Sequence, residues 1–299
     1  MTYVLTLIGA LAKAPLTTAH IDVARRAAEN ATASPGEADW LADGEACDIP
    51  FQGDASAVLS IARQALGGLP IDLAALPADN RRKKLLIADM DSTLIEQECI
   101  DELADEIGRG ATVSAITERA MRGEIEFEPA LKERVALLAG LPAAIVDKVL
   151  KQRITLMPGG RQLVQTMRAH GAHTSLVSGG FTAFAGPVAE KLGFDDFRAN
   201  TLLSGPNGTF SGHVAEPILG RQAKEETLRT RLAEHGLAHC DALAVGDGAN
   251  DLAMIALAGL GVAYHAKPKV REQADAAIEH NDLTALLFLQ GYRREEFSS

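Results

Sequence analysis

One short stretch near residue 90 does most to restrict what this chain can fold into. The apolar run LLIA at 85–88 ends abruptly in the polar run DMDST at 89–93. A continuous apolar run of this length is typical of a strand buried on both faces, as in the centre of a parallel sheet. Open parallel sheets bind their ligands outside the carboxyl ends of the strands. The stretch therefore predicts a buried central strand that opens directly into a site.

Two carboxylates, Asp89 and Asp91, stand at this expected strand end. Residues two apart in an extended chain point to the same face, so the two carboxylates are expected to lie side by side. Close carboxylates are unfavourable unless they share a cation or one of them keeps its proton. The pair indicates metal and acid–base chemistry, although an Asp-x-Asp tripeptide taken alone is more often a polar turn.

Length, charge and cysteine content exclude several classes of protein. The 299 residues, 47% of them hydrophobic, are enough for about two domains with a substantial core. A formal net charge of −11 argues against a surface that binds nucleic acid or anionic lipid, and no apolar run approaches the ~20 residues of a membrane span. The three cysteines lack disulfide or zinc spacing, which fits a reducing compartment. We expect a cytoplasmic protein with no nucleic-acid or membrane partner.

Residues 1–80 predict a small separate α+β domain. The expected elements alternate as strand, helix, strand, helix, strand over residues 3–8, 18–30, 40–51, 55–66 and 71–76. This order is typical of a ferredoxin-like sandwich. The polar segment 77–84 that follows predicts a linker.

Residues 81–299 predict an α/β domain of the doubly wound type. A helical pattern over about 96–155 directly follows the first strand, as expected for an inserted cap above a site. Segments 197–203 and 209–214 are expected to pair as a hairpin. Further strands are predicted between helices at 173–177, 242–245 and 261–264. This alternation predicts a mostly parallel sheet with helices on its faces.

Three polar turns are expected to meet at one edge of this sheet, because each directly follows a predicted strand. They are 89–93, 178–180 and 246–251. Their carboxylates are hard oxygen ligands of the kind that Mg²⁺ takes: Asp89, Asp91, Asp247 and, as a further candidate, Asp251.

Groups that can bind phosphate are expected at the same edge of the sheet. Ser178 and the main-chain N–H of Gly179 can donate hydrogen bonds, and Lys224 supplies a positive charge. Each piece alone has an ordinary explanation as a turn, a helix cap or a solvated helix face. Their joint occurrence at successive strand ends predicts a phosphate site.

These residues also carry a resemblance to a known family. DMDST at 89–93, LVSGG at 176–180, Lys224 and VGDGAND at 245–251 resemble the four motifs of haloacid-dehalogenase-type phosphohydrolases, over roughly residues 83–290. The cap sequences IEQECIDELA, MRGEIEFEPALKERVALL and ITLMPGG resemble those of phosphoserine phosphatases. The resemblance implies a Rossmann-like core of the haloacid-dehalogenase type. By element order and position alone, residues 1–80 resemble the ACT-like domains that precede this unit in some members.

The resemblance implies Mg²⁺-dependent hydrolysis of O-phospho-L-serine, the last step of serine biosynthesis. Asp89 would attack phosphorus and form an aspartyl-phosphate, while Asp91 would protonate the leaving oxygen and then deprotonate water. Mg²⁺ would bind the Asp89 carboxylate, the Asp91 main-chain carbonyl and Asp247. The phosphoryl group would be held by Ser178, Gly179 and Lys224, with Asn250 nearby and Asp251 supporting the metal.

The cap would recognise the amino-acid end of the substrate. The resemblance assigns Glu98 to the ammonium group and Arg134 to the carboxylate, which a guanidinium group matches with two hydrogen bonds. It also assigns Met121 and Phe127 to an apolar lid. Without the resemblance, the first two would be ordinary charged helix positions and the last two ordinary core residues.

Other functions remain open on the sequence alone. The motifs do not separate phosphoserine from other small phosphomonoesters, nor hydrolysis from phosphoryl transfer to another alcohol. A function of a different class is an amino-acid sensor built on residues 1–80, against which the intact Asp89, Asp91, Lys224 and Asp247 argue. The sequence does not decide between a monomer and a homodimer.

Overall fold

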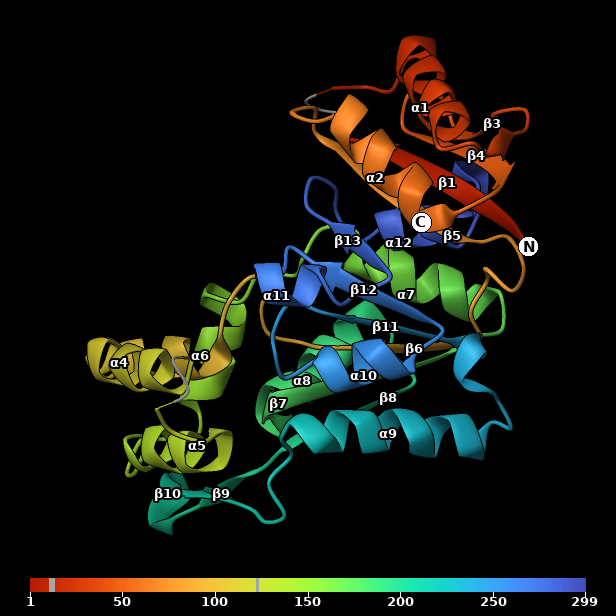
Figure 1. Cartoon of the computed structure of the whole chain (residues 1–299). Helices are drawn as coiled ribbons and strands as arrows, with labels where there is room; N and C mark the ends of the chain where they lie inside the picture. Colours follow the sequence, from red (N-terminus) through yellow and green to blue (C-terminus); the bar gives the residue numbers. More distant parts are fainter. Residues whose placement is uncertain (11–13, 122–123) are drawn as a thin grey trace.

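Two larger β-sheets, each with its own helices, organise the chain, and a third sheet has two strands (Figure 1). The computed structural model describes residues 1–10, 14–121 and 124–299. Within these residues no helix is long and apolar enough to cross a membrane.

The N-terminal sheet is antiparallel, in the order β2-β4-β1-β5 with β3 also beside β4. Its elements are β1 (Thr2–Gly9), α1 (Thr18–Asn30), β2 (Ser34–Pro35), β3 (Asp39–Ala42), β4 (Ala46–Gln52), α2 (Ala55–Ala65) and β5 (Ile71–Pro77). The segment predicted as one irregular strand at 40–51 is a pair of strands, β3 and β4. Apart from the two-residue β2, the order is therefore β-α-β-β-α-β, which is the ferredoxin-like pattern. The ACT-like character of this unit stays a prediction.

Both faces of the N-terminal sheet are covered. Leu5 and Leu7 of β1 point to the apolar cluster beneath α1 and α2, whereas Ile8 belongs to the cluster of the second sheet's domain. Thr6, between them, is also fully buried. The sheet therefore lies between its own helices and the rest of the chain (Figure 1).

The second sheet is entirely parallel, in the order β13-β12-β11-β6-β7-β8. Its strands are β6 (Leu85–Ala88), β7 (His173–Phe181), β8 (Asp196–Asn200), β11 (Ala242–Gly246), β12 (Leu260–Tyr264) and β13 (Ala276–Ile278). The chain winds outward from β6 to β8 and then in the other direction from β11 to β13. The predicted doubly wound sheet is confirmed, and its switch point lies between β6 and β11.

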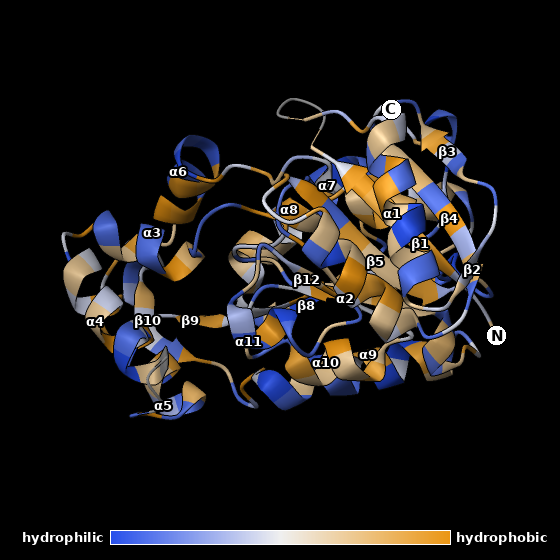
Figure 2. Cartoon of the chain, turned by 45° about the horizontal axis from the view of Figure 1, so that its top comes forward, coloured by the Kyte–Doolittle hydropathy of each residue, from blue (hydrophilic) through white to orange (hydrophobic). Residues whose placement is uncertain are grey.

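Helices cover both faces of this sheet. Leu86 and Ala88 of β6 share a cluster with α7, α8 and α12, whereas Leu85 and Ile87 share one with α9 and α10. The covering helices are α7 (Gly160–Ala169), α8 (Thr182–Leu192), α9 (Arg221–Glu234), α10 (Leu252–Leu257), α11 (Pro268–Arg271) and α12 (Ala285–Leu289). Of these helices, α7 and α9 carry both hydrophobic and hydrophilic residues along their length (Figure 2), whereas α10 and α12 are apolar throughout. This burial on two sides explains why 85–88 is apolar without alternation.

The cap extends from one side of the core and is built from two chain segments (Figure 1). Its helices are α3 (Cys99–Asp105), α4 (Gly110–Met121), α5 (Phe127–Ala136) and α6 (Ile145–Gln152). The hairpin of β9 (Leu202–Ser204) and β10 (Phe210–Val214) joins it, because the Gly140 N–H donates to Phe210 O (2.9 Å) and the Phe210 N–H to Leu141 O (2.8 Å). The predicted hairpin partner 197–203 was wrong in its first part, since β8 pairs with β7 in the main sheet.

The predicted linker 77–84 is packed rather than free. The guanidinium group of Arg81 pairs with Asp48 of β4 and donates to Thr6 Oγ1 (3.1 Å) and to the carbonyl oxygens of Phe288 and Leu289 at the end of α12. A cation at a helix C-terminus also meets the negative end of the helix dipole. Arg81 therefore joins the two parts of the molecule.

Candidate active site

Asp89 is fixed at the switch point of the parallel sheet. Its main-chain N–H donates to Val245 O (3.0 Å), which continues the pairing of β6 with β11 one residue beyond the strand. The side chain is only 4% exposed. The carboxylate therefore occupies the place where the topology predicts ligand binding.

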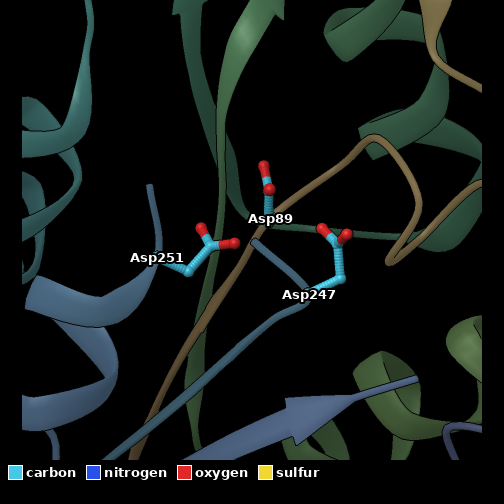
Figure 3. A group of neighbouring side chains, drawn as sticks. All are labelled: Asp89, Asp247 and Asp251. Atoms are coloured by element: carbon cyan, nitrogen blue, oxygen red, sulfur yellow. The ribbon is translucent and has the colours of Figure 1, made fainter. Parts of the chain in front are cut away.

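Three carboxylates meet there, from two segments that are far apart in the sequence (Figure 3). One oxygen each of Asp89, Asp247 and Asp251 lies within 4.8 Å of the others. Burial, and next the charge of Asp89, raise the pKa of Asp247 to about 6 and that of Asp251 to about 7. Close, buried carboxylates of this kind fit a hard divalent cation, which would favour their charged forms.

Lys224 of α9 supplies the positive charge of the site. Its Nζ lies 2.7 Å from Asp89 Oδ1 and 2.6 Å from Asp251 Oδ1. Burial alone would lower the pKa of Lys224, but the two carboxylates outweigh it and raise the pKa overall. Lys224 therefore stays charged and holds Asp89 in place.

The glycines after β11 make room for Asp251 to fold back over the turn. A Cβ atom at Gly246 would lie 2.3 Å from Asp251 Cγ, and the Gly248 N–H donates to Asp251 Oδ2 (3.0 Å). Asn250 folds over the same turn, since its Oδ1 is 2.2 Å from where a Gly248 Cβ would be. Glycine is required here because a side chain at 246 would displace Asp251 and one at 248 would displace Asn250.

Asp91 lies beside Ser178, as the sequence predicts. Ser178 Oγ donates to Asp91 Oδ2 (3.1 Å), and the Cys99 N–H donates to Asp91 Oδ1 (2.9 Å). Burial, and next the charge of Glu98, raise the pKa of Asp91 to about 7. A carboxyl group with this pKa exchanges protons readily at neutral pH, which suits a general acid and base.

The phosphate-binding turn predicted at 178–180 lies within β7, which continues to Phe181, and the pairing with β8 shifts register there. The Gly180 N–H donates to Ser178 Oγ (2.8 Å), and a Cβ atom at Gly180 would lie 2.8 Å from Asp91 Oδ2. The irregular strand end thus brings Ser178 against Asp91.

Two charged residues of the cap face this site. Glu98 immediately precedes α3, and its side chain accepts a hydrogen bond from Ser92 Oγ (2.8 Å) and reaches solvent. Burial, and next the charges of Asp247 and Asp89, raise the pKa of Glu98. Arg134 of α5 is half-buried. Burial lowers the pKa of its guanidinium group, and the charges of Asp101, Glu98 and Asp91 oppose this shift. The structure brings both close to Asp91.

Phe127 closes the cap against the core. Its ring lies 3.2 Å from where a Cβ of Gly179 would be and 3.3 Å from that of Gly220. Met121 ends α4, and its side chain lies outside the described residues.

Comparison with known proteins decides the family. Residues 86–256 match the family model described as haloacid dehalogenase-like hydrolase.

The chain belongs to this family.

Individual relatives show to which members of the family the chain is most similar in sequence. It is 45% identical over 227 residues to a phosphoserine phosphatase of Polaromonas sp., covering 74% of this chain and 96% of that protein. It is 44% identical over 219 residues to the phosphoserine phosphatase SerB2 of Mycobacterium tuberculosis, covering 73% of this chain but only 53% of that protein. The solved structure of a probable phosphoserine phosphatase from Vibrio cholerae is similar with a TM-score of 0.79 and 33% identity, covering 99% of this chain and 88% of that one. Within the family, the chain groups with the phosphoserine phosphatases.

Sequence reasoning missed one residue that shapes this hydrolase site. Asn200, at the end of β8, is 2% exposed; its Nδ2 donates to Gly179 O (2.8 Å) and Leu219 O (3.1 Å), and its Oδ1 accepts from the Leu219 N–H (2.7 Å). It ties the end of β7 at Gly179 to the segment that leads into α9 and Lys224. A single sequence gives no signal for such a contact between distant segments.

Proposed function

We propose that this hydrolase converts O-phospho-L-serine and water to serine and phosphate, through a phosphoryl group carried on Asp89. The observation that carries the proposal is the position of Asp89, which is buried at the switch point, pairs with Lys224 and forms the acidic cluster with Asp247 and Asp251. The group of relatives named as phosphoserine phosphatases supports the substrate.

Each residue has a defined part in two successive displacements. Asp89 attacks phosphorus, and Asp91 gives its proton to the serine oxygen that leaves. Asp91 then accepts a proton from the water that attacks the aspartyl-phosphate, which releases phosphate and restores Asp89. Ser178, Gly179 and Lys224, with Asn250 beside them, hold the phosphoryl oxygens.

The acidic cluster is proposed to hold Mg²⁺. The Asp89 carboxylate, the main-chain carbonyl of Asp91 and Asp247 would bind the ion directly, and Asp251 would support this arrangement. The bound ion would reduce the negative charge of the phosphate group that an anionic nucleophile must approach.

The cap is proposed to select the substrate. Arg134 would bind its carboxylate and Glu98 its ammonium group, while Phe127 and Met121 would cover it. If so, Arg134→Ala removes a charge-assisted contact and lowers kcat/KM for phosphoserine by roughly 10–150-fold. Phosphoethanolamine lacks the carboxylate, so we expect it to be a poor substrate whose kcat/KM barely responds to the same change. Phosphate release from the two substrates measures both effects.

An equal loss on the two substrates would show that Arg134 supports the fold or the phosphate instead. If the enzyme hydrolysed another small phosphomonoester in preference to phosphoserine, the proposed site would stand and its proposed substrate would change. A cytoplasmic location, a place at the end of serine biosynthesis and a homodimer remain predictions.

A further inference from the structure

A buried side-chain amide holds the main chain near the end of β7. Asn200, the last residue of β8, accepts a hydrogen bond from the Leu219 N–H at Oδ1 (2.7 Å) and donates from Nδ2 to Gly179 O (2.8 Å) and Leu219 O (3.1 Å). A main-chain N–H can only donate, so the contact with Leu219 fixes which end of the amide faces Gly179. Both N–H groups of the Asn200 amide are therefore directed at main-chain carbonyl groups.

The carbonyl group of Gly179 belongs to the peptide that joins Gly179 to Gly180. A trans peptide is planar, and its C=O and N–H groups point in opposite directions. On the side away from Asn200, the Gly180 N–H of this peptide donates to Ser178 Oγ (2.8 Å). Asn200 and Ser178 thus contact the same peptide from opposite sides, and the hydrogen bond from Asn200 fixes where the N–H of this peptide points.

The orientation of this peptide decides what Ser178 can do with its single hydroxyl hydrogen. Because Ser178 Oγ accepts a hydrogen bond from the Gly180 N–H, the hydroxyl hydrogen is left for Asp91 Oδ2 (3.1 Å). A flipped peptide would present the Gly179 carbonyl oxygen to Ser178 instead. The hydroxyl hydrogen would then be drawn to that oxygen and away from Asp91.

The residues on either side of the peptide make such a flip easy. A Cβ atom at Gly180 would lie 2.8 Å from Asp91 Oδ2, and one at Gly179 would lie 3.2 Å from the Phe127 ring, so close packing favours glycine at both positions. Glycine has the widest range of main-chain dihedral angles. A peptide between two glycines is therefore the least restrained by its own chain, and it needs a contact from elsewhere to keep one orientation.

We propose that Asn200 is a positioning residue, which prevents a flip of the peptide between Gly179 and Gly180 and so keeps the Ser178 hydroxyl group directed at Asp91. The inference rests on the proposed function, in which Asp91 exchanges protons with the leaving oxygen and water and Ser178 holds a phosphoryl oxygen. The hydrogen bonds of Asn200 go to the main chain, so it acts on the reaction only through other residues.

Asn200→Leu removes the hydrogen bonds of the amide and keeps a side chain of similar size. We expect kcat for phosphoserine to fall about 10- to 100-fold, as for a misplaced catalytic group. KM should stay within about threefold, because the cap is proposed to bind the amino-acid end of the substrate. The same fall in kcat is expected with phosphoethanolamine, since the peptide lies at the phosphate end that the two substrates share.

Gln290→Met is the matched control for the loss of a buried amide. Gln290 also joins distant segments through main-chain groups, because its Oε1 accepts from the Lys83 N–H (3.0 Å) and its Nε2 donates to Leu286 O (3.0 Å). Gln290→Met should lower Tm, as Asn200→Leu should, but leave kcat within about twofold. Thermal unfolding and phosphate release, measured on both variants, separate a loss of stability from a loss of positioning.

A second substitution changes the orientation of the peptide by charge. Asn200→Asp can still accept from the Leu219 N–H, but a carboxylate has no N–H group for Gly179 O and attracts the Gly180 N–H to its own side. We expect kcat to fall at least as far as in Asn200→Leu. In a Ser178→Ala background, either substitution at 200 should lower kcat by less than about threefold further, because the hydroxyl group through which Asn200 acts is gone.

A folded Asn200→Leu or Asn200→Asp protein with the kcat of the parent would overturn the proposal. A fall that is as large in the Ser178→Ala background as in the parent would also overturn it, since Asn200 would then act through the fold and not through Ser178. If the parent prefers another phosphomonoester to phosphoserine, the proposed substrate fails. The same variants, assayed on the preferred ester, still test the position of Ser178.

Discussion

The surface between the N-terminal sheet and the core differs from the surface between the cap and the site in how its charges are matched. At the first, Arg81 pairs with Asp48, and Asp72 of β5 accepts hydrogen bonds from three consecutive N–H groups at 279–281 and from Asn281 Nδ2. At the second, among residues 1–10, 14–121 and 124–299, Arg134 has two long hydrogen bonds and Asp101 keeps a buried oxygen unpaired.

The comparison separates two uses of buried charge. Where Arg81 and Asp72 have all the partners they need, the charges fix one part of the chain to another. Where charges at the cap lack partners, a ligand must supply them, because burial without a partner is unfavourable. The N-terminal unit is thus attached through satisfied contacts, whereas the cap keeps charges that the substrate is proposed to match.

The largest expected difference between the two surfaces concerns turnover. Asp89→Asn should lower kcat by at least about 10⁴-fold, since the amide cannot act as the nucleophile. Asp48→Asn makes the same change at a buried carboxylate of the N-terminal surface and should leave kcat within a few-fold. Phosphate release, measured below the melting temperature of each variant, gives the comparison. Normal turnover in Asp89→Asn would remove the nucleophile from the mechanism.

A second difference concerns stability. Arg81→Met leaves Asp48 buried without its cation and should lower the free energy of unfolding by about 3–5 kcal/mol. Arg134→Met breaks no ion pair with any residue that the structure describes, so it should change the free energy of unfolding by less than about 1 kcal/mol. Urea unfolding followed by circular dichroism measures both. Equal losses would mean that the cap charge is structural as well.

The smallest effect is the response of the acidic cluster to pH. The pKa values of Asp247 and Asp251, about 6 and about 7, lie above the ordinary value of 3.8, so the folded protein binds more protons than the unfolded chain. The stability of the metal-free protein therefore falls as pH rises from about 4 to about 7. Mg²⁺ binding should restore the stability that is lost at high pH. The rise in Tm caused by Mg²⁺ should therefore be larger at pH 8 than at pH 5.5. We expect the two rises to differ by about 2–4 °C, which is the change in Tm that 1 kcal/mol produces in a protein of this size.

Thermal scans with Mg²⁺ and with EDTA at both pH values test this expectation. Asp247→Asn should remove most of the difference, whereas Asp72→Asn at the N-terminal surface should keep it. A stabilisation by Mg²⁺ that does not depend on pH would argue against binding at these carboxylates.

The sequence predicted the parts of the molecule that depend on local pattern and on the rules of parallel sheets. The apolar run 85–88 is a central strand, and Asp89, Lys224, Asp247 and Asp251 meet at its end. Such convergence follows from the sheet itself, because the carboxyl ends of parallel strands share one edge.

Features that depend on contacts between distant segments were not predicted. The β9–β10 hairpin joins the cap through main-chain bonds to residues near 140 and through apolar packing of Leu202 and Phe210, and the short strand β13 carries too weak a pattern to be recognised. The polar segment 77–84 was interpreted as a linker because the partners of Arg81, at 48 and 288–289, are remote in the sequence. A polar residue gives no sign in sequence of whether its partner is water or another part of the chain.

The most direct test of the account is to trap the phosphoryl group on the enzyme. Brief exposure of the Mg²⁺-loaded protein to phosphoserine labelled at phosphorus, followed by an acid quench, should leave close to one acid-stable, base-labile phosphoryl group per active chain, located at Asp89 by peptide mass spectrometry. Asp89→Asn should leave none. Turnover by the parent enzyme with no trapped label under single-turnover conditions, or a label on another residue, would contradict the assignment of Asp89 as the nucleophile.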